Sequence, residues 1–354
     1  MIVNKEKLQV LDNYLQTCVE ENVFPGCDFG LILPDEKYFL YHGYKQLYPQ
    51  KITNDHDTIW DLASISKVLV TTTCILKLME EGLITLKTPI ADIVKEFENK
   101  TITIKDCITH SSGLEPDIAG YKNMTQEQMY DYVYHASCTF ETGTKVTYSD
   151  INFILLGLVV KNLKGSLDGY AKEIMFEPLE MHDTCYNPDE SVYERLAAYE
   201  DQASRNGVVR GKVHDGKAYK FGGVSGHAGV FSTLEDISHF VQMILNDGYY
   251  NGKKYFSDAT IDLLKKCQTP GLNESRSIAW VLSDPNYALG DYYSEHTLYH
   301  TGFSGPSIQI DLDRKVAFVC LNNRVHPTRD NNLILTRRNN IHNLAYQCLE
   351  KGGK

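Results

Sequence analysis

Residues 64–81 of this 354-residue chain read SISKVLVTTTCILKLMEE and combine a helical pattern with two reactive side chains. Apolar or nearly apolar side chains recur there at steps of three and four residues, at positions 68, 69, 72, 75, 76 and 79. This period predicts an amphipathic helix with one apolar stripe. Gly82 follows directly, where a glycine often ends a helix. The segment therefore predicts a helix that begins near Ser64 and packs against a core.

Ser64 and Lys67 stand three residues apart at the start of this helix. Residues i and i+3 share a helix face, so the lysine amine can lie beside the serine hydroxyl and take its proton if the pKa of the amine is lowered. The helix N-terminus also supplies backbone N–H groups that stabilise a developing oxyanion. About one S-x-x-K occurrence is expected by chance in a chain of this length. The motif alone is therefore weak ground for assigning a nucleophile.

Two further short motifs come later in the chain. Tyr148-Ser149-Asp150 precedes an apolar helical segment, and on its own Ser149 or Asp150 is simply a good helix N-cap. His300-Thr301-Gly302 precedes a second glycine and a proline, and its own glycine either admits a ligand close to the backbone or makes a turn between strands. Neither motif by itself indicates a catalytic site.

The order of the three motifs is more informative than any one of them. S-x-x-K at 64, Y-x-[N/D] 84 residues later and [K/H]-T-G another 152 residues later resemble the signature of the serine β-lactamase and penicillin-binding protein superfamily. The tyrosine version resembles the class C β-lactamase branch, with its esterase, peptidase and D,D-carboxypeptidase relatives. The resemblance runs from about residue 24 to residue 330 and includes segments 24–26, 108–114, 226–233 and 323–327.

The resemblance implies a proton-transfer role for three side chains around one nucleophile. Ser64 would be acylated, and Lys67 would accept or relay its proton. Tyr148 would be the partner general base and acid, its phenolate stabilised by Lys67 and His300. Water would then hydrolyse the acyl-enzyme, with no metal or organic cofactor.

The backbone near the third motif would bind the substrate. By the same resemblance, the N–H groups of Ser64 and Phe303 form the oxyanion hole. Thr301 and Gly302 would line the edge strand along which the substrate lies. Arg324 follows the last strand and is either a ligand for a substrate carboxylate, as in class C enzymes, or a surface arginine.

Two positions depart from the class C pattern. Asp150 stands where those enzymes carry asparagine, and an ionised carboxylate cannot donate a hydrogen bond to a substrate carbonyl. His300 stands where they carry lysine, and histidine is only partly charged near pH 7. Both changes weaken a β-lactam interpretation and favour an esterase or peptidase-like relative, with Asp150 still expected to lie against the substrate.

Histidines near the glycine-rich segment 222–226 allow two interpretations. His227, with His214 and Asp215, either lines one wall of the cleft or belongs to a structural loop. Their spacing, like that of His296 and His300, matches no metal-ligand pattern. No metal site is predicted.

Strand-like segments lie at both chain ends, with helical patterns between them. Strands are predicted at 27–33, 37–43, 277–282, 307–312 and 315–321. Helices are predicted at 5–21, 64–81, 103–110, 125–136, 150–162, 166–175, 234–247 and 330–350. The predicted fold class is α+β and β-lactamase-like. Residues 1–61 and 270–354 are expected to form an antiparallel sheet flanked by helices, and residues 62–269 a mostly helical lobe, with the active site between them.

Composition and charge limit the classes of binding partner that we expect. A net charge of −11 leaves no basic footprint for nucleic acid or an anionic membrane, and no run of 18 apolar residues occurs. Nine scattered cysteines without a C-x-x-C pair are typical of a reducing compartment, and residues 1–7 lack the apolar run of a secretory signal. We expect a cytoplasmic protein, unless the chain is a processed mature form, with a small-molecule acyl substrate. The pattern does not define the oligomeric state.

Three functions follow as hypotheses. The first is a serine hydrolase of small esters or amides that forms an acyl-enzyme at Ser64. The second is a β-lactamase or a D,D-carboxypeptidase or D-aminopeptidase-like enzyme. The third is a catalytically idle ligand-binding or sensor module, which the joint presence of Ser64, Lys67 and Tyr148 disfavours.

Overall fold

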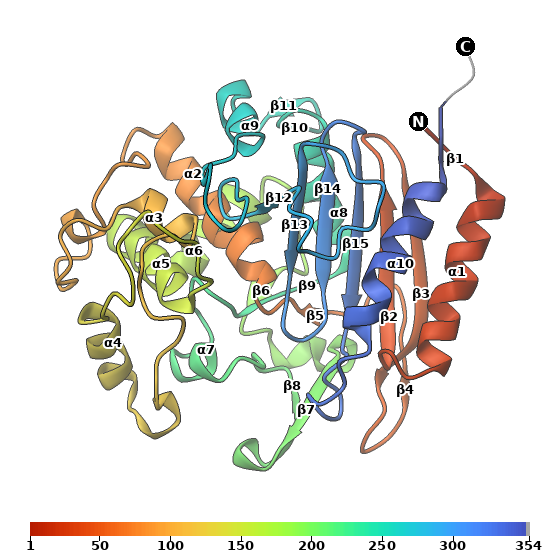
Figure 1. Cartoon of the computed structure of the whole chain (residues 1–354). Coiled ribbons are helices and arrows are strands. Elements are labelled where there is room, and N and C mark those ends of the chain that lie inside the picture. The colour runs from red at the N-terminus through yellow and green to blue at the C-terminus, as the bar shows by residue number, and fades with distance from the viewer. Residues whose placement is uncertain (352–354) are drawn as a thin grey trace.

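The computed structural model describes residues 1–351, and a seven-stranded antiparallel sheet forms one side of the molecule (Figure 1). The strand order is β12-β13-β14-β15-β2-β3-β4. Strands from both chain ends meet in the middle, where Val319 of β15 pairs with Gly30 of β2. The bounds are β2 Gly26–Ile32, β3 Lys37–Gln46, β4 Ile52–Thr53, β12 Val281–Leu282, β13 Thr297–Thr301, β14 Ser307–Asp311 and β15 Val316–Asn322.

Different helices cover the two faces of the sheet, because alternate residues of a strand point to opposite sides. Phe29 and Leu31 of β2 pack in one cluster with side chains of α1 (Lys5–Glu20) and α10 (Ile334–Gln347), which lie together on one face in Figure 1. On the other face, a Cβ built on Gly30 would be 2.9 Å from Leu234 Cδ1 of α8 (Leu234–Leu245). Glycine at position 30 therefore lets α8 pack directly on the sheet.

The helical part of the molecule surrounds α5 (Asp150–Lys164), whose residues 151–160 are all buried. A helix that is apolar on every side belongs in the interior. The other helices are α2 Thr72–Glu80, α3 Ile104–Ile108, α4 Gln126–Tyr134, α6 Leu167–Ala171, α7 Gly216–Lys220 and α9 Asp258–Leu264, with π turns at Lys67–Thr71 and Lys172–Phe176 and 3₁₀ turns at Ile90–Asp92, Tyr121–Asn123, Glu190–Arg195 and Ala203–Arg205. The short strands are β1 Ile2–Val3, β5 Trp60–Asp61, β6 Cys185–Tyr186, β7 Ala198–Gln202, β8 Gly207–Arg210, β9 Val230–Ser232, β10 Tyr249–Tyr250, β11 Lys253–Lys254 and β16 Leu349–Glu350.

The predicted α+β, β-lactamase-like fold class is confirmed, and several elements differ in detail. The helix predicted at 166–175 divides into α6 and the π turn Lys172–Phe176. The helix predicted at 64–81 contains a π turn before α2, and the chain leaves it at Gly82 with φ 74°. The strand predicted at 277–282 is wrong in its first part. There the Ser277 N–H donates to the Trp280 carbonyl at 2.9 Å and Ala279 has φ 69°, so the chain turns and only β12 pairs with β13. Within residues 1–351, no helix has the length and hydropathy needed to cross a membrane.

The buried carboxyl of Asp28 on β2 makes the stability of the fold depend on pH. Burial raises its pKa to about 8, against the hydrogen bonds donated by Asn54 Nδ2 at 2.6 Å and Trp60 Nε1 at 2.7 Å. The unfolded chain has a pKa of about 3.9 at this group, so between these values the folded state binds the extra proton and stability falls as pH rises.

We expect the free energy of unfolding of the wild type, relative to Asp28→Asn, to fall by about 1.4 kcal/mol per unit from pH 5 to pH 7. Asparagine does not titrate, so the difference between the two proteins isolates this carboxyl from all others. Urea unfolding at several pH values measures it. Parallel pH profiles for the two proteins would show that Asp28 is ionised in the folded state.

Candidate active site

A strained turn places Ser64 at the start of its helix. Ala63 has φ 46°, in the left-handed region that costs a residue with a Cβ about 1–2 kcal/mol. The buried carboxylate of Asp61, at the end of β5, accepts the Ala63 N–H at 2.8 Å and the His214 N–H at 2.6 Å. These bonds hold the turn, so a rigid support carries the Ser64 hydroxyl.

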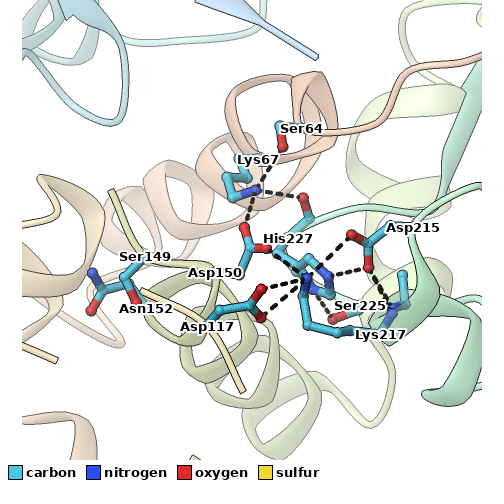
Figure 2. Close-up of polar contacts among 12 residues, drawn as sticks. Ser64, Lys67, Asp117, Ser149, Asp150, Asn152, Asp215, Lys217, Ser225 and His227 are labelled. Carbon is cyan, nitrogen blue, oxygen red and sulfur yellow. Dashed lines mark hydrogen bonds and ion pairs between the residues drawn. The ribbon is translucent and has the colours of Figure 1, made fainter. Parts of the chain in front are cut away.

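Lys67 is fully buried behind Ser64, and its ammonium has three partners (Figure 2). Its Nζ lies 3.0 Å from Ser64 Oγ, 2.8 Å from Asp150 Oδ1 and 2.9 Å from the His227 carbonyl oxygen. Burial alone would lower the pKa of Lys67, but the carboxylate of Asp150 and the neighbouring Tyr148 outweigh burial and raise that pKa. Asp150 thus favours the charged form of the group that is expected to take the Ser64 proton.

Asp150 belongs to a closed set of polar contacts that we call the ion ring: Lys67, Asp150, Lys217, Asp215 and His227. Lys217 Nζ lies 3.2 Å from Asp150 Oδ2 and 3.4 Å from Asp215 Oδ2, and His227 Nε2 lies 2.9 Å from Asp215 Oδ1. The His227 carbonyl closes the ring on Lys67. Figure 2 shows Lys217 Nζ between the carboxylates, with Asp117 as a further partner at 3.1 Å.

Two neighbours in the ion ring, Asp150 and Lys217, have shifted pKa values. Burial would raise the pKa of Asp150, but Lys67, His227 and Lys217 outweigh burial and lower it. Burial would likewise lower the pKa of Lys217, but Asp215 and Asp150 raise it. Asp150 is therefore an ionised carboxylate shared by two ammonium groups.

Tyr148 lies beside this ring with its side chain open to the cleft. It is 37% exposed, and its ring centroid lies 4.9 Å from Lys67 Nζ. The imidazole of His110 packs against it with ring centroids 4.5 Å apart, and the Arg276 guanidinium lies 5.9 Å from its ring. The phenol ring therefore lies near two cationic side chains.

His300 is buried behind Tyr148, with ring centroids 6.0 Å apart. Its Nδ1 lies 3.0 Å from the Thr301 carbonyl oxygen, which can only accept, so Nδ1 carries the proton. Burial, then Arg276 and Lys67, lowers the pKa of His300 well below its usual range. The neutral ring presents Nε2 as an acceptor, so it does not donate to a Tyr148 phenolate as the resemblance implied.

The end of β13 faces the Ser64 turn. β12 pairs only with Leu298 and Tyr299, which leaves the Thr301 end of the strand as an open edge. A Cβ on Gly302 would lie 2.7 Å from the Leu62 carbonyl oxygen, so glycine is needed for this close approach. Within residues 1–351, neither the Ser64 nor the Phe303 backbone N–H has an acceptor, as an oxyanion hole requires.

The structure places the two arginines after the last strand differently. Arg324 is buried against Phe303, and its Nη1 donates to the Asn331 carbonyl at 2.6 Å. Arg329 is half exposed, lines the cleft and binds both carboxylate oxygens of Glu200 at 2.7 and 2.6 Å. Arg329, rather than Arg324, is the arginine that reaches the space in front of Ser64.

The buried His227 side chain does not line the cavity in front of Ser64. Its Nδ1 lies 2.7 Å from Ser225 Oγ, and its Nε2 faces Asp215. Asp150, Asp215 and His227 offer possible metal-ligand atoms within 4.8 Å of one another. The ammonium of Lys217 contacts both carboxylates, so the chain itself already compensates their charge.

A cavity of about 440 Å³ opens in front of Ser64. Its wall includes Tyr148, Asp150, Lys217 and Phe303. A second cavity of about 690 Å³ adjoins it and shares five wall residues: Tyr121, Lys122, His214, Gly216 and Arg329. The second cavity adds Arg205 and Lys220 to this wall, together with Glu200 and Asp201. The site is thus an elongated cleft lined by charged side chains of both signs together with uncharged ones.

Sequence reasoning missed three charged residues of the site: Lys217, Asp117 and Arg276. Lys217 follows Asp215 by two residues, and α7, which carries it, has only five residues and no periodic pattern. Asp117 and Arg276 lie in irregular segments. The only signal was the nearby His214-Asp215 pair, whose two interpretations the spacing left open.

Comparisons with known proteins agree with the fold. A family model described as "Beta-lactamase" matches residues 11–342. The "N-acetylmuramyl-L-alanine amidase" of Bacillus subtilis (strain 168) is 30% identical over 309 residues, 76% of this chain and 68% of that protein. A "Putative D-alanyl-D-alanine carboxypeptidase" of Escherichia coli O157:H7 is 30% identical over 367 residues, 91% of this chain and 83% of that protein.

Solved structures share the fold at lower identity. A penicillin-binding protein homologue from Caulobacter crescentus superposes with a TM-score of 0.78 over 99% of both chains, at 17% identity. "EstCE1, a hydrolase with promiscuous acyltransferase activity" gives a TM-score of 0.74 over 95% of this chain and 99% of that one, at 18% identity. At these identities the likeness concerns the fold alone.

Proposed function

The chain belongs to the β-lactamase family of serine hydrolases, and from this premise we propose that it cleaves an amide bond of a polar, peptide-like substrate through an acyl-enzyme at Ser64. The observation that carries the proposal is the 3.0 Å contact between Ser64 Oγ and the buried Nζ of Lys67, on the wall of a cavity that Tyr148 also lines. A nucleophile beside a base, and both beside a second proton carrier, is the arrangement that acyl transfer needs.

The proposed reaction has two halves. In the first, which requires the neutral amine form of Lys67, Ser64 Oγ bonds to the carbonyl carbon while its proton passes to that amine. The N–H groups of Ser64 and Phe303 hold the oxyanion. The C–N bond then breaks as Tyr148 gives its proton to the leaving amine, and the proton on Lys67 restores the phenol. In the second half, water attacks the ester, its proton returns through the same pair, and the acid leaves with Ser64 restored.

The lining of the cleft supports a polar substrate over a small apolar ester. Six of the 14 residues around the cavity in front of Ser64 are charged, as are six of the 13 around the second cavity, and an apolar acyl chain would have to desolvate these groups. The Bacillus subtilis relative is named for an amide bond between a sugar acid and alanine, and the Escherichia coli relative for a D-alanyl peptide bond. Both names describe amide cleavage next to alanine.

A substrate panel tests the proposal. Wild type is incubated with N-acetylmuramyl-L-alanyl-D-isoglutamine, diacetyl-L-lysyl-D-alanyl-D-alanine, p-nitrophenyl butyrate and nitrocefin. We expect release of the amine from one of the two amides, with a mass increase on the Ser64 peptide. Turnover of the butyrate ester alone would favour the small-ester hypothesis. Binding of an amide without any adduct or product would favour an idle module and overturn the proposal.

A D,D-carboxypeptidase is the second candidate, favoured by the relative that aligns with 91% of the chain. The panel separates a carboxypeptidase from an amidase of the muramyl substrate, because the carboxypeptidase releases free D-alanine from the lysyl peptide and leaves the muramyl amide intact. A neutral His300 in place of a fixed lysine cation supports neither a carboxylate clamp nor strong β-lactam turnover.

We also propose a reducing, cytoplasmic location. All nine cysteines carry free thiols, and six of them are buried, as is usual for small apolar residues in reduced proteins. Cell fractionation with an antibody against the protein tests this location.

A further inference from the structure

We propose that Lys217 is a positioning residue of this site, which neutralises the far oxygen of Asp150 and thereby keeps Lys67 able to take the Ser64 proton. The proposal rests on the proposed function, in which Lys67 is the proton acceptor. Lys217 Nζ lies 3.2 Å from Asp150 Oδ2, while Lys67 Nζ lies 2.8 Å from Asp150 Oδ1, so one carboxylate bridges the two ammonium groups.

The number of cations bound to Asp150 determines how strongly this carboxylate holds the proton of Lys67. A carboxylate paired with one buried ammonium holds that ammonium's proton strongly, because its full charge acts on one partner in a medium of low polarity. A second ammonium on the other oxygen partly neutralises the carboxylate and therefore weakens its attraction for the proton of the first. Without Lys217, Asp150 and Asp215 would face each other with no cation between them, and Lys67 would carry more of the compensation.

The geometry of the ion ring makes this effect specific. Lys217 is buried and comes from α7, and Asp150 is the first residue of α5, so this ion pair joins two separate elements. The other charged or titratable groups around Lys67 are not altered by a substitution of Lys217 itself; they are Tyr148, His110, Arg276, His227 and His300. Around Lys217 they are Asp117, Asp215 and Tyr121.

The test is the pH profile of Ser64 acylation by p-nitrophenyl acetate between pH 6 and pH 9.5. In Lys217→Met we expect the ascending limb to move about one unit to higher pH, and acylation at pH 7 to fall about tenfold. Lys217→Arg keeps the charge and should retain the wild-type limb. Lys212→Met is the matched control, because Lys212 is an exposed lysine five residues away on the same segment. EDTA is present throughout, so that no metal replaces the lost ammonium.

The decisive comparison is rescue by Asp150→Asn. This change removes the charge that Lys217 compensates, so in the double variant Asp150→Asn/Lys217→Met the limb should return toward the wild-type position. Asp150→Asn alone should move it about one unit to lower pH. If Lys217→Met does not fold, the pH profile of Asp150→Asn against that of the wild type still tests whether the Asp150 charge moves the acylation limb to higher pH.

Two results would overturn the inference. One is an unchanged limb in Lys217→Met with a lower melting temperature, which is what a purely structural lysine gives. The other is a limb that moves upward in Asp150→Asn, which would make Lys67 act as a cation rather than a base. If the wild type forms no Ser64 adduct, the proposed function is wrong. This result is distinguishable from failure of the Lys217 inference, in which the wild type is acylated but the variants do not shift the limb as expected.

Discussion

Ser64→Ala is expected to abolish the covalent adduct with every acyl donor and to lower amide turnover by at least about 10³-fold. The reason is geometric, because Ser64 Oγ is the hydroxyl that lies 3.0 Å from Lys67 Nζ on the cavity wall. Any remaining rate would come from the free N–H groups and the positioned water alone. Intact-mass spectrometry after incubation with the panel amides measures the adduct, and amine release measures the turnover.

Ser66→Ala is the control for that loss. Ser66 is buried one position before Lys67, and its Oγ accepts the Val230 N–H at 3.1 Å. Its removal should cost about 1 kcal/mol of stability and leave the Ser64 adduct in place. Equal adducts in wild type and Ser64→Ala, or loss of the adduct only in Ser66→Ala, would place the nucleophile elsewhere.

The proximity of Ser64 and Lys67 followed from the sequence because it depends only on local geometry. Three residues on a helix bring two side chains to one face whatever the rest of the chain does, and the observed contact is of that kind. The same holds for the fold class, since strands at both chain ends can satisfy their backbone groups only by pairing. In the structure β2 and β15 do so across most of the chain length.

The ion ring could not be predicted, because it depends on how distant segments pack. Asp150 and Lys217 are 67 residues apart and meet at 3.2 Å only when α7 packs beside the start of α5. By its place in the motif, Asp150 replaces a substrate-binding amide, but the partners of the Asp150 carboxylate are Lys67 and Lys217. The charge of His300 also depended on burial and on Arg276, neither of which shows in a motif.

Tyr148→Phe is expected to lower kcat/KM for the panel amide by about 10²–10⁴-fold while acylation by p-nitrophenyl acetate falls much less. An amide can leave only if its nitrogen gains a proton, whereas nitrophenolate leaves as a stable anion. Phenylalanine keeps the ring that packs 4.5 Å from His110 and removes only the proton-carrying hydroxyl. Stopped-flow acylation with the ester and amine release from the amide provide the two rates.

Tyr193→Phe is the matched control, because Tyr193 is 43% exposed against 37% for Tyr148 and lies outside both cavities. It should leave both rates within about twofold of the wild type, as expected for a surface change away from the site. The ratio of ester to amide rates distinguishes a loss of packing from a loss of proton delivery. A general loss of packing in Tyr148→Phe would lower both rates together, and an equal loss on ester and amide would therefore remove Tyr148 from proton delivery. A selective loss on the amide assigns the leaving-group proton to the hydroxyl that Lys67 and Arg276 flank at 4.9 and 5.9 Å from its ring.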